Sequence, residues 1–392
     1  MKRSIICVTD YFLPGFRGGG PIRTLANLRE LVGATAEIAV FTRDRDLGSD
    51  IGYPGIHTDT WLEDDRGPIF YAKPACFGAR GLARAISLRR FDLLYLNSFF
   101  SLRGSILPLF LRRFSGRRSP LALPILLAPR GEFSPGALAL KRRKKRVFIA
   151  AARVLGLHRG IHWQASTEEE AEHIRHQFPE AAPRIHLAVD PVVVGPDVAV
   201  LASPGVAGQL RIAFISRIAP MKNLDGLLRI LAGVRVPVTL NIHGPVEDEV
   251  HWQQCRELIA RLPGNITVTT AGPLDPDAVS RVFAEHDLFA LPTHGENFGH
   301  VVFEALRAGT QVLVSDRTPW KTLPSGALMS LPLNDVDGWR YAIEAAAHRP
   351  ITERLSLRAE AVTYAREYVA SSDARKRNID MFESVAASRE RD

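Results

Sequence analysis

Residues 287–316 read DLFALPTHGENFGHVVFEALRAGTQVLVSD, and this stretch decides the fold class. An apolar run of strand length, residues 288–291, is broken by the sequence Pro-Thr-His-Gly. Asn297 is expected to cap the helix that follows, and Gly309 to end it. The residues expected to face the core are Val301, Val302, Ala305 and Leu306. Residues 311–314 form another apolar run, so the order strand, loop, helix, strand predicts a parallel α/β sheet.

Two carboxylates bracket the corner between the first strand and the helix, Glu296 before the helix and Glu304 on it. The start of a helix at the carboxyl end of a strand offers free N–H groups and a favourable dipole to an anion. Acidic groups beside such a site suit the hydroxyls of a sugar better than a phosphate. The ordinary alternative is a pair of solvated surface glutamates.

A basic pair leaves a second strand end upstream, in residues 211–223 (RIAFISRIAPMKN). Pro220 ends the strand, and Asn223 is expected to cap a helix whose buried face is Leu224, Leu227, Leu228 and Leu231. Arg217 and Lys222 lie between the strand and the helix, so we expect them to converge on one anion. Two cations beside a helix N-terminus suit a diphosphate.

The combination of Arg217 and Lys222 with HGENFGHVVFEALRAGTQVLVSD resembles the retaining GT-B glycosyltransferases of family 4, also called glycosyltransferase group 1. The resemblance covers essentially the whole chain. It implies two Rossmann-like, doubly wound parallel-sheet domains that face each other across a cleft. It also implies transfer of a sugar from a nucleotide-diphosphate sugar (UDP, GDP or another), with retention of anomeric configuration.

The same resemblance assigns roles to the donor-site residues. Arg217 and Lys222 neutralise the diphosphate, Glu296 holds the sugar hydroxyls, and these three are the predicted catalytic residues. Glu304 accepts hydrogen bonds from the ribose. The backbone of three residues completes the predicted sugar site: Asn297, Phe298 and Gly299.

A chain of 392 residues is too long for one ordinary core, so two domains are expected. We place an acceptor-binding domain at residues 1–195 and a donor-binding domain at 208–369. The segment 190–209 is rich in Pro, Gly, Val and Ala and is the predicted linker. The resemblance implies that a last helix, at about 370–392, crosses back to the first domain.

Glycines mark two further strand ends. Residues 10–21 (DYFLPGFRGGGP) follow a predicted strand at 4–9 and do not match the dinucleotide pattern G-x-G-x-x-G, which weighs against an NAD-linked dehydrogenase. The resemblance implies that Gly18 and Gly19 face the donor diphosphate; a flexible turn is the alternative. Gly244 ends the predicted strand 238–243 and is expected to approach the nucleotide.

Two polar residues end predicted strands of the first half. Asn97 follows residues 93–96 and is predicted to line the acceptor site. Arg130 follows residues 121–128, where many members of the family carry a His. Two alternatives stay open for Arg130: it binds an anionic group of the acceptor, or it forms a structural ion pair.

Positive charge is concentrated in the first half of the chain. Residues 1–195 hold 29 Lys and Arg against 18 Asp and Glu (+11), and the remainder holds 21 against 24 (−3), which together give the net charge of +8. The run KRRKKR from Lys141 to Arg146 is the densest cluster. It predicts contact with an anionic membrane surface, which would suit an acceptor carried on a lipid. No aromatic platform accompanies it, so nucleic acid is not an expected partner, and a solvated helix face is the simpler alternative.

The remaining composition favours a cytoplasmic protein, peripheral on the inner face of the cytoplasmic membrane. The longest apolar runs are short of the about 20 residues that span a bilayer, and the three cysteines lack disulfide or metal spacing. No metal and no cofactor are expected, because the Asp-x-Asp triplets suit surface turns or helix caps: Asp44 and Asp46, Asp275 and Asp277, Asp335 and Asp337. Other functions compatible with the fold are a nucleotide-sugar epimerase, an inverting transferase or a non-catalytic protein that docks on membranes.

Overall fold

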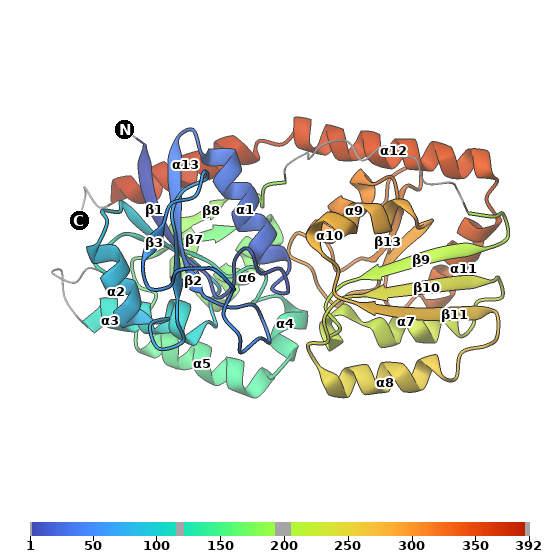
Figure 1. Cartoon of the computed structure of the whole chain (residues 1–392), viewed down its shortest axis with the longest axis horizontal. Helices are drawn as coiled ribbons and strands as arrows, with labels where there is room; N and C mark the ends of the chain where they lie inside the picture. Colours follow the sequence, from blue (N-terminus) through green and yellow to red (C-terminus); the bar gives the residue numbers. More distant parts are fainter. Residues whose placement is uncertain (1, 115–120, 193–204, 389–392) are drawn as a thin grey trace. The chain divides into compact units, whose positions relative to one another are not determined.

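The computed structural model describes residues 2–114, 121–192 and 205–388 (Figure 1). The chain forms two compact units, Met1–Val193 with Asp373–Asp392, and Val194–Ser372. Most of the predicted linker lies outside the described residues. Within the described part of the chain, no helix has both the length and the apolar character needed to cross a bilayer.

An eight-stranded sheet forms the centre of the first unit, in the order β3-β4-β2-β1-β5-β6-β7-β8. Neighbouring strands are parallel except β3 and β4. The order reverses between β1 and β5, which makes their carboxyl ends a topological switch point. The strands are β1 Arg3–Val8, β2 Ala36–Arg43, β3 Trp61–Leu62, β4 Ile69–Ala72, β5 Leu93–Asn97, β6 Ile125–Ala128, β7 His162–Ala165 and β8 Ile185–Leu187.

Helices cover both faces of this sheet (Figure 1). One face packs against α1 (Gly20–Val32) and α13 (Ala374–Ala387). The other packs against α2 (Ala79–Ser87), α3 (Leu107–Phe114), α5 (Arg142–Val154) and α6 (Glu168–Gln177). Short helical segments complete the unit: η1 Leu102–Ile106, α4 Pro135–Ala139 and η2 Pro179–Arg184.

The second unit is built on a six-stranded, fully parallel sheet in the order β11-β10-β9-β12-β13-β14. This is the order of the doubly wound nucleotide-binding fold, with its switch point between β9 and β12. The strands are β9 Leu210–Ile215, β10 Val238–His243, β11 Ile266–Gly272, β12 Leu288–Leu291, β13 Gln311–Ser315 and β14 Leu328–Leu331. The predicted α/β class is therefore confirmed in both units.

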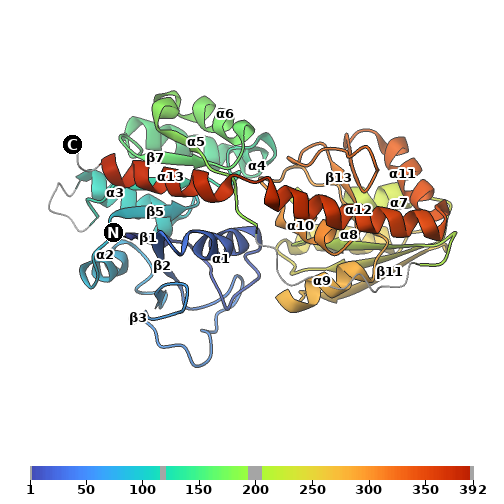
Figure 2. The ribbon, with the colours of Figure 1, turned by 90° about the horizontal axis from the view of Figure 1, so that it is seen from above.

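Two layers of helices enclose the second sheet (Figure 2). One layer holds α7 (Leu224–Leu231), α8 (Glu249–Ile259) and α11 (Val336–His348). The other holds α9 (Pro276–Ala284), α10 (His300–Arg307) and α12 (Ile351–Ala370), and a single turn, η3 (Pro220–Lys222), precedes α7. The predicted buried face of α7 is confirmed, since Leu224, Leu227, Leu228 and Leu231 are each at most 1% exposed.

The predicted helix caps need correction. The N-cap of α10 is Gly299, with φ 80°, and not Asn297. The chain enters α10 through a left-handed residue, a conformation that glycine adopts without steric cost. Asn223 is the N-cap of α7, but it is also left-handed and its side chain donates to the carbonyl of Pro292 (2.8 Å) instead of capping the helix. Gly309, with φ 76°, ends α10 as predicted.

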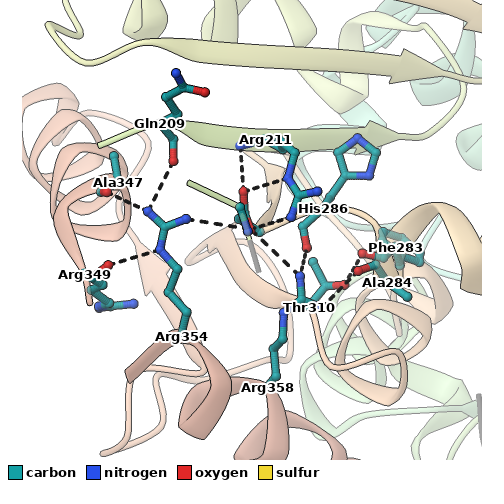
Figure 3. Close-up of polar contacts among 12 residues, drawn as sticks. Gln209, Arg211, Phe283, Ala284, His286, Thr310, Ala347, Arg349, Arg354 and Arg358 are labelled. Carbon is teal, nitrogen blue, oxygen red and sulfur yellow. Dashed lines mark hydrogen bonds and ion pairs between the residues drawn. The ribbon is translucent and has the colours of Figure 1, made fainter. Parts of the chain in front are cut away.

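The side chain of Asp287, which is 5% exposed, fastens α12 to the amino edge of the second sheet; Figure 3 shows the arginines of this region, Arg211, Arg354 and Arg358. Asp287, directly before β12, accepts from the backbone and the guanidinium of Arg211 at 3.0–3.1 Å. Two arginines of α12 also face it, Arg354 at 3.8 Å and Arg358 at 3.9 Å. Burial alone would raise the pKa of Asp287, but the hydrogen bonds from Arg211 lower it below its ordinary value of 3.8.

Candidate active site

The candidate site lies at the switch point of the second sheet, where the loops after β9 and β12 meet. The backbone N–H of His294 donates to the carbonyl of Met221 (2.8 Å), and the Thr293 hydroxyl donates to the same carbonyl (3.0 Å). The Ser315 hydroxyl at the end of β13 donates to the carbonyl of Thr293 (2.6 Å). These bonds hold the ends of three adjacent strands in one arrangement, and in doubly wound sheets ligands bind at this edge.

Lys222 and Glu296 form an ion pair across this junction. Each side chain is 13% exposed, so the pair is largely shielded from water. The two residues are 74 positions apart in the chain. They come together because η3 follows β9 and the loop with Glu296 follows β12, and these two strands are neighbours in the sheet. Lys222 and Glu296 were predicted from the sequence to belong to one site, and in the structure their side chains are in direct contact.

Arg217 has a partner that the sequence did not suggest. Its guanidinium pairs with the carboxylate of Glu247, in the loop after β10, and both side chains are partly exposed. Glu247 could have been found as an acidic residue that follows a third strand end at the same edge. Arg217 and Lys222 therefore pair with carboxylates of two different loops.

Gly244 lies where the loop after β10 meets the end of β9. It has φ 142°, and a Cβ at this position would lie 1.8 Å from the carbonyl oxygen of Ser216. Only glycine allows this close approach of two backbones. The structure thus gives Gly244 a packing role, and its predicted approach to the nucleotide stays a prediction.

The loop from Glu296 to Gly299 is fixed by residues that follow β13. The N–H of Glu296 donates to the carbonyl of Arg317 (3.1 Å), and the indole of Trp320 donates to the carbonyl of Phe298. Phe298 is 4% exposed, so its ring belongs to the core, and the contact of its backbone with a sugar stays a prediction. Trp320 is a positioning residue for this loop.

Two further predicted donor-site residues are Asn297, within this loop, and Glu304, on the helix that follows it. The side-chain Nδ2 of Asn297 is buried and has no hydrogen-bond partner within the described part of the chain. A buried donor without a partner is costly, so a ligand acceptor at this position would be stabilised. Glu304 is half-buried on α10, the helix that starts at the end of the loop.

In the first unit, the glycines follow β1 and lead into α1. Gly19, with φ 71°, is the N-cap of α1, and Gly18 precedes it. The carboxylate of Asp46 holds this loop by accepting from the N–H groups of Phe16 (2.9 Å) and Arg17 (3.2 Å). Asp46 therefore serves the loop conformation, and contact of Gly18 and Gly19 with a diphosphate stays a prediction.

Arg130 and Asn97 belong to one buried network at the carboxyl edge of the first sheet. Arg130 forms an ion pair with Asp190, and both side chains are at most 8% exposed. Arg130 also donates to Asn97 (3.0 Å), and the Asn97 amide donates to the Cys7 sulfur (2.9 Å). Burial acts to lower the pKa of Arg130, but Asp190, Tyr95, Glu170 and Cys7 together outweigh it, so the pKa is raised. This geometry favours the structural ion pair among the two alternatives for Arg130.

Glu132, two residues further on, was not singled out from the sequence. Its carboxylate accepts from the Ser98 hydroxyl (2.7 Å) and from the N–H groups of Phe99 and Phe100. Burial raises the pKa of Glu132 to about 7, against the lowering effect of these hydrogen bonds. Glu132 thus joins the loops that follow β5 and β6.

Among the described residues, no three His, Cys, Asp or Glu side chains are grouped so that they could hold a metal ion. Aspartates of two Asp-x-Asp triplets have structural contacts. Asp46 holds the loop before α1, and Asp44 pairs with Arg45. Asp335 caps α11 by accepting from the N–H of Gly338 (2.9 Å), and Asp337 pairs with Arg340. The expectation that no metal is needed stays a prediction.

Comparisons with known proteins agree with this location. The family model "Glycosyl transferases group 1" matches residues 203–321, which include the loops after β9, β10 and β12. A D-inositol 3-phosphate glycosyltransferase of Nocardia farcinica is 34% identical over 116 residues, covering 28% of this chain and 26% of that protein. The corresponding protein of Mycobacterium ulcerans is 31% identical over 193 residues, covering 46% and 41%. The matches thus span less than half of these curated relatives.

Solved structures resemble the whole chain in fold. Anabaena HepE in complex with UDP and glucose has a TM-score of 0.67 at 16% identity, covering 98% of this chain and all (100%) of that one. Sucrose-phosphate synthase of Thermosynechococcus elongatus has a TM-score of 0.65 at 15% identity, covering 100% and 98%. At such low identities the similarity shows the fold alone. It confirms the predicted GT-B fold.

Proposed function

We propose that this chain, which has the GT-B fold and carries a glycosyl transferases group 1 domain, is a retaining hexosyltransferase of family 4. It transfers a sugar from a nucleotide-diphosphate sugar to an acceptor. The observation that carries the proposal is the contact of Lys222 with Glu296 at the switch point. A cation for phosphate and a carboxylate for hydroxyls, held side by side, fit the two chemical parts of such a donor. The solved relative from Anabaena binds UDP and glucose, which supports the same donor class.

Departure of the nucleoside diphosphate is the difficult step of this reaction. Negative charge grows on the leaving phosphate as its bond to the anomeric carbon breaks. The acceptor hydroxyl oxygen bonds to that carbon, and its proton leaves with the nucleoside diphosphate. In the proposal, Lys222 and Arg217 stabilise that charge, together with the positive end of the α10 dipole. Glu296 and the backbone of residues 297–299 orient the sugar, and Glu304 binds the ribose.

A screen of nucleoside diphosphates and their sugars by thermal shift tests the donor class. One nucleotide should raise the melting temperature by about 5–10 °C at a hundredfold excess over its Kd. Transfer that follows on addition of an acceptor, with the product anomer read by NMR, separates a retaining transferase from an inverting transferase or an epimerase. A protein that binds no nucleotide in the screen would contradict the proposal.

We further propose that the acceptor is a lipid-linked or cell-surface glycan intermediate, met at the inner face of the cytoplasmic membrane. The support is the outward face of α5. Val147 and Val154 are 71% and 86% exposed and lie about two helical turns apart. The basic run 141–146 occupies the start of the same helix. On α3, Phe110 and Phe114 are also exposed. Apolar side chains among cations are typical of a helix that lies on an anionic bilayer.

Replacing four exposed cations of this run by glutamine should abolish most binding to vesicles that contain anionic lipid. The residues are Arg142, Arg143, Lys144 and Arg146. Lys145 is kept, because its ammonium donates to the Ala137 carbonyl (2.7 Å). At about 1 kcal/mol for each charge, the vesicle affinity should fall at least a hundredfold at low salt. Co-sedimentation measures it, with purely zwitterionic vesicles as the control. Equal binding of both proteins would refute a role for the run.

A further inference from the structure

Glu247 is held beside Arg217 by the backbone as well as by charge. The N–H of Ile218 donates to the carbonyl of Pro245 (2.9 Å), and the carbonyl of Ile218 accepts from the N–H of Glu247 (3.1 Å). Ile218 itself is 3% exposed, so this junction is anchored in the core. These backbone bonds place Glu247 next to the strand end that carries Arg217.

The charges of the two ion pairs cancel each other. Arg217 and Lys222 contribute two positive charges, and their partners Glu247 and Glu296 contribute two negative ones. The two pairs differ in exposure: both side chains of the Lys222 pair are 13% exposed, whereas those of the Arg217 pair are 36% and 42% exposed. A pair this exposed contributes about 0–1 kcal/mol, so a diphosphate can exchange with the Glu247 carboxylate.

We propose that Glu247 sets the affinity for the donor by competing with its diphosphate for Arg217. The inference rests on the proposed function, because it needs Arg217 to bind the diphosphate. A ligand gains the full charge of Arg217 only by displacing Glu247, so groups that carry at least two negative charges are favoured. Glu247 is thus a specificity-determining residue that no motif identifies.

The variant Glu247→Gln tests the proposal on the full chain. It keeps the shape of the side chain and removes the competing charge. Isothermal titration with UDP and with GDP should give a Kd about three- to fivefold lower than for the unchanged protein, for the nucleotide that binds. The effect should shrink as salt is added, because the pair is partly exposed.

Glu249→Gln is the matched control for net charge. Glu249 lies two residues further on, is 72% exposed and pairs with Arg256 of its own helix, α8. This variant removes the same charge from the protein without touching Arg217, so its Kd should equal that of the unchanged protein. A gain as large as that of Glu247→Gln would show a general charge effect and overturn the proposal.

The double variant Arg217→Ala/Glu247→Gln completes the cycle. If Glu247 acts through Arg217, the double variant should have the same Kd for the nucleotide as Arg217→Ala alone. A lower Kd in the double variant than in Arg217→Ala overturns the proposal. So does a Kd for Glu247→Gln that is equal to or higher than that of the unchanged protein, provided that the unchanged protein binds the nucleotide. If the unchanged protein binds neither UDP nor GDP nor another nucleoside diphosphate, the proposed function itself fails.

Discussion

Replacing Lys222 by alanine is expected to lower the rate of sugar transfer about a hundredfold or more. The ammonium is the cation placed closest to the predicted sugar ligand Glu296, and one such charge at a leaving group is typically worth about 3–4 kcal/mol of barrier. The loss should appear in kcat as well as in kcat/KM, since the charge on the leaving phosphate grows in the transition state. Initial rates of transfer or of donor hydrolysis measure it.

Lys321→Ala is the control for this experiment. Lys321 is exposed on the loop after β13, in the same unit, and should tolerate the change without loss of rate. Lys222→Ala leaves Glu296 without its partner, so thermal unfolding of each variant must accompany the rates. Equal rates for Lys222→Ala and the unchanged protein would remove the basis of the enzymatic assignment.

Replacing Asp287 by alanine is expected to lower the free energy of unfolding by about 3–5 kcal/mol. The side chain is 5% exposed, and its removal takes away the carboxylate that Arg211, Arg354 and Arg358 share (Figure 3). A loss of this size corresponds to a fall in melting temperature of about 10 °C for a unit of this length. Differential scanning calorimetry measures it. Asp337→Ala is the control, because that carboxylate is 95% exposed and should matter little.

The pH dependence of the same cluster has a definite sign. The pKa of Asp287 is lower in the folded protein than its ordinary value, so its ion pairs contribute full stability above that ordinary value and lose it as pH falls through the folded pKa. The stability difference between the unchanged protein and Asp287→Asn should therefore be constant near neutral pH and shrink below about pH 4. A difference that keeps its size in acid would contradict the ion-pair account.

Local sequence patterns were sufficient for the elements around the site. The apolar run before Pro292 is β12, with bounds 288–291 as expected, and the Leu spacing after Asn223 gives the buried face of α7. Lys222 and Glu296 could be placed at one edge because parallel strands end on the same side of a sheet. That rule depends on strand direction alone, so it holds across 74 residues of sequence.

Pairings that depend on three-dimensional packing were not predictable in this way. Glu247 reaches Arg217 from a strand end 30 residues away, and Asp190 reaches Arg130 across 60 residues. No spacing rule selects these partners from the other charged residues of the chain. The cap of α10 was missed for a related reason: Trp320 holds the carbonyl of Phe298, which moves the start of the helix to Gly299.

The second sheet separates its two groups of charges by strand direction. The Asp287 cluster lies where β9 and β12 begin, and the pairs of Lys222 and Arg217 lie where the same strands end. Mutations that adapt the protein to a new donor would fall on loops that do not contribute to the fastening of α12. Laboratory evolution of the loops after β9, β10 and β12 should therefore find variants of altered selectivity without first requiring a stabilised parent.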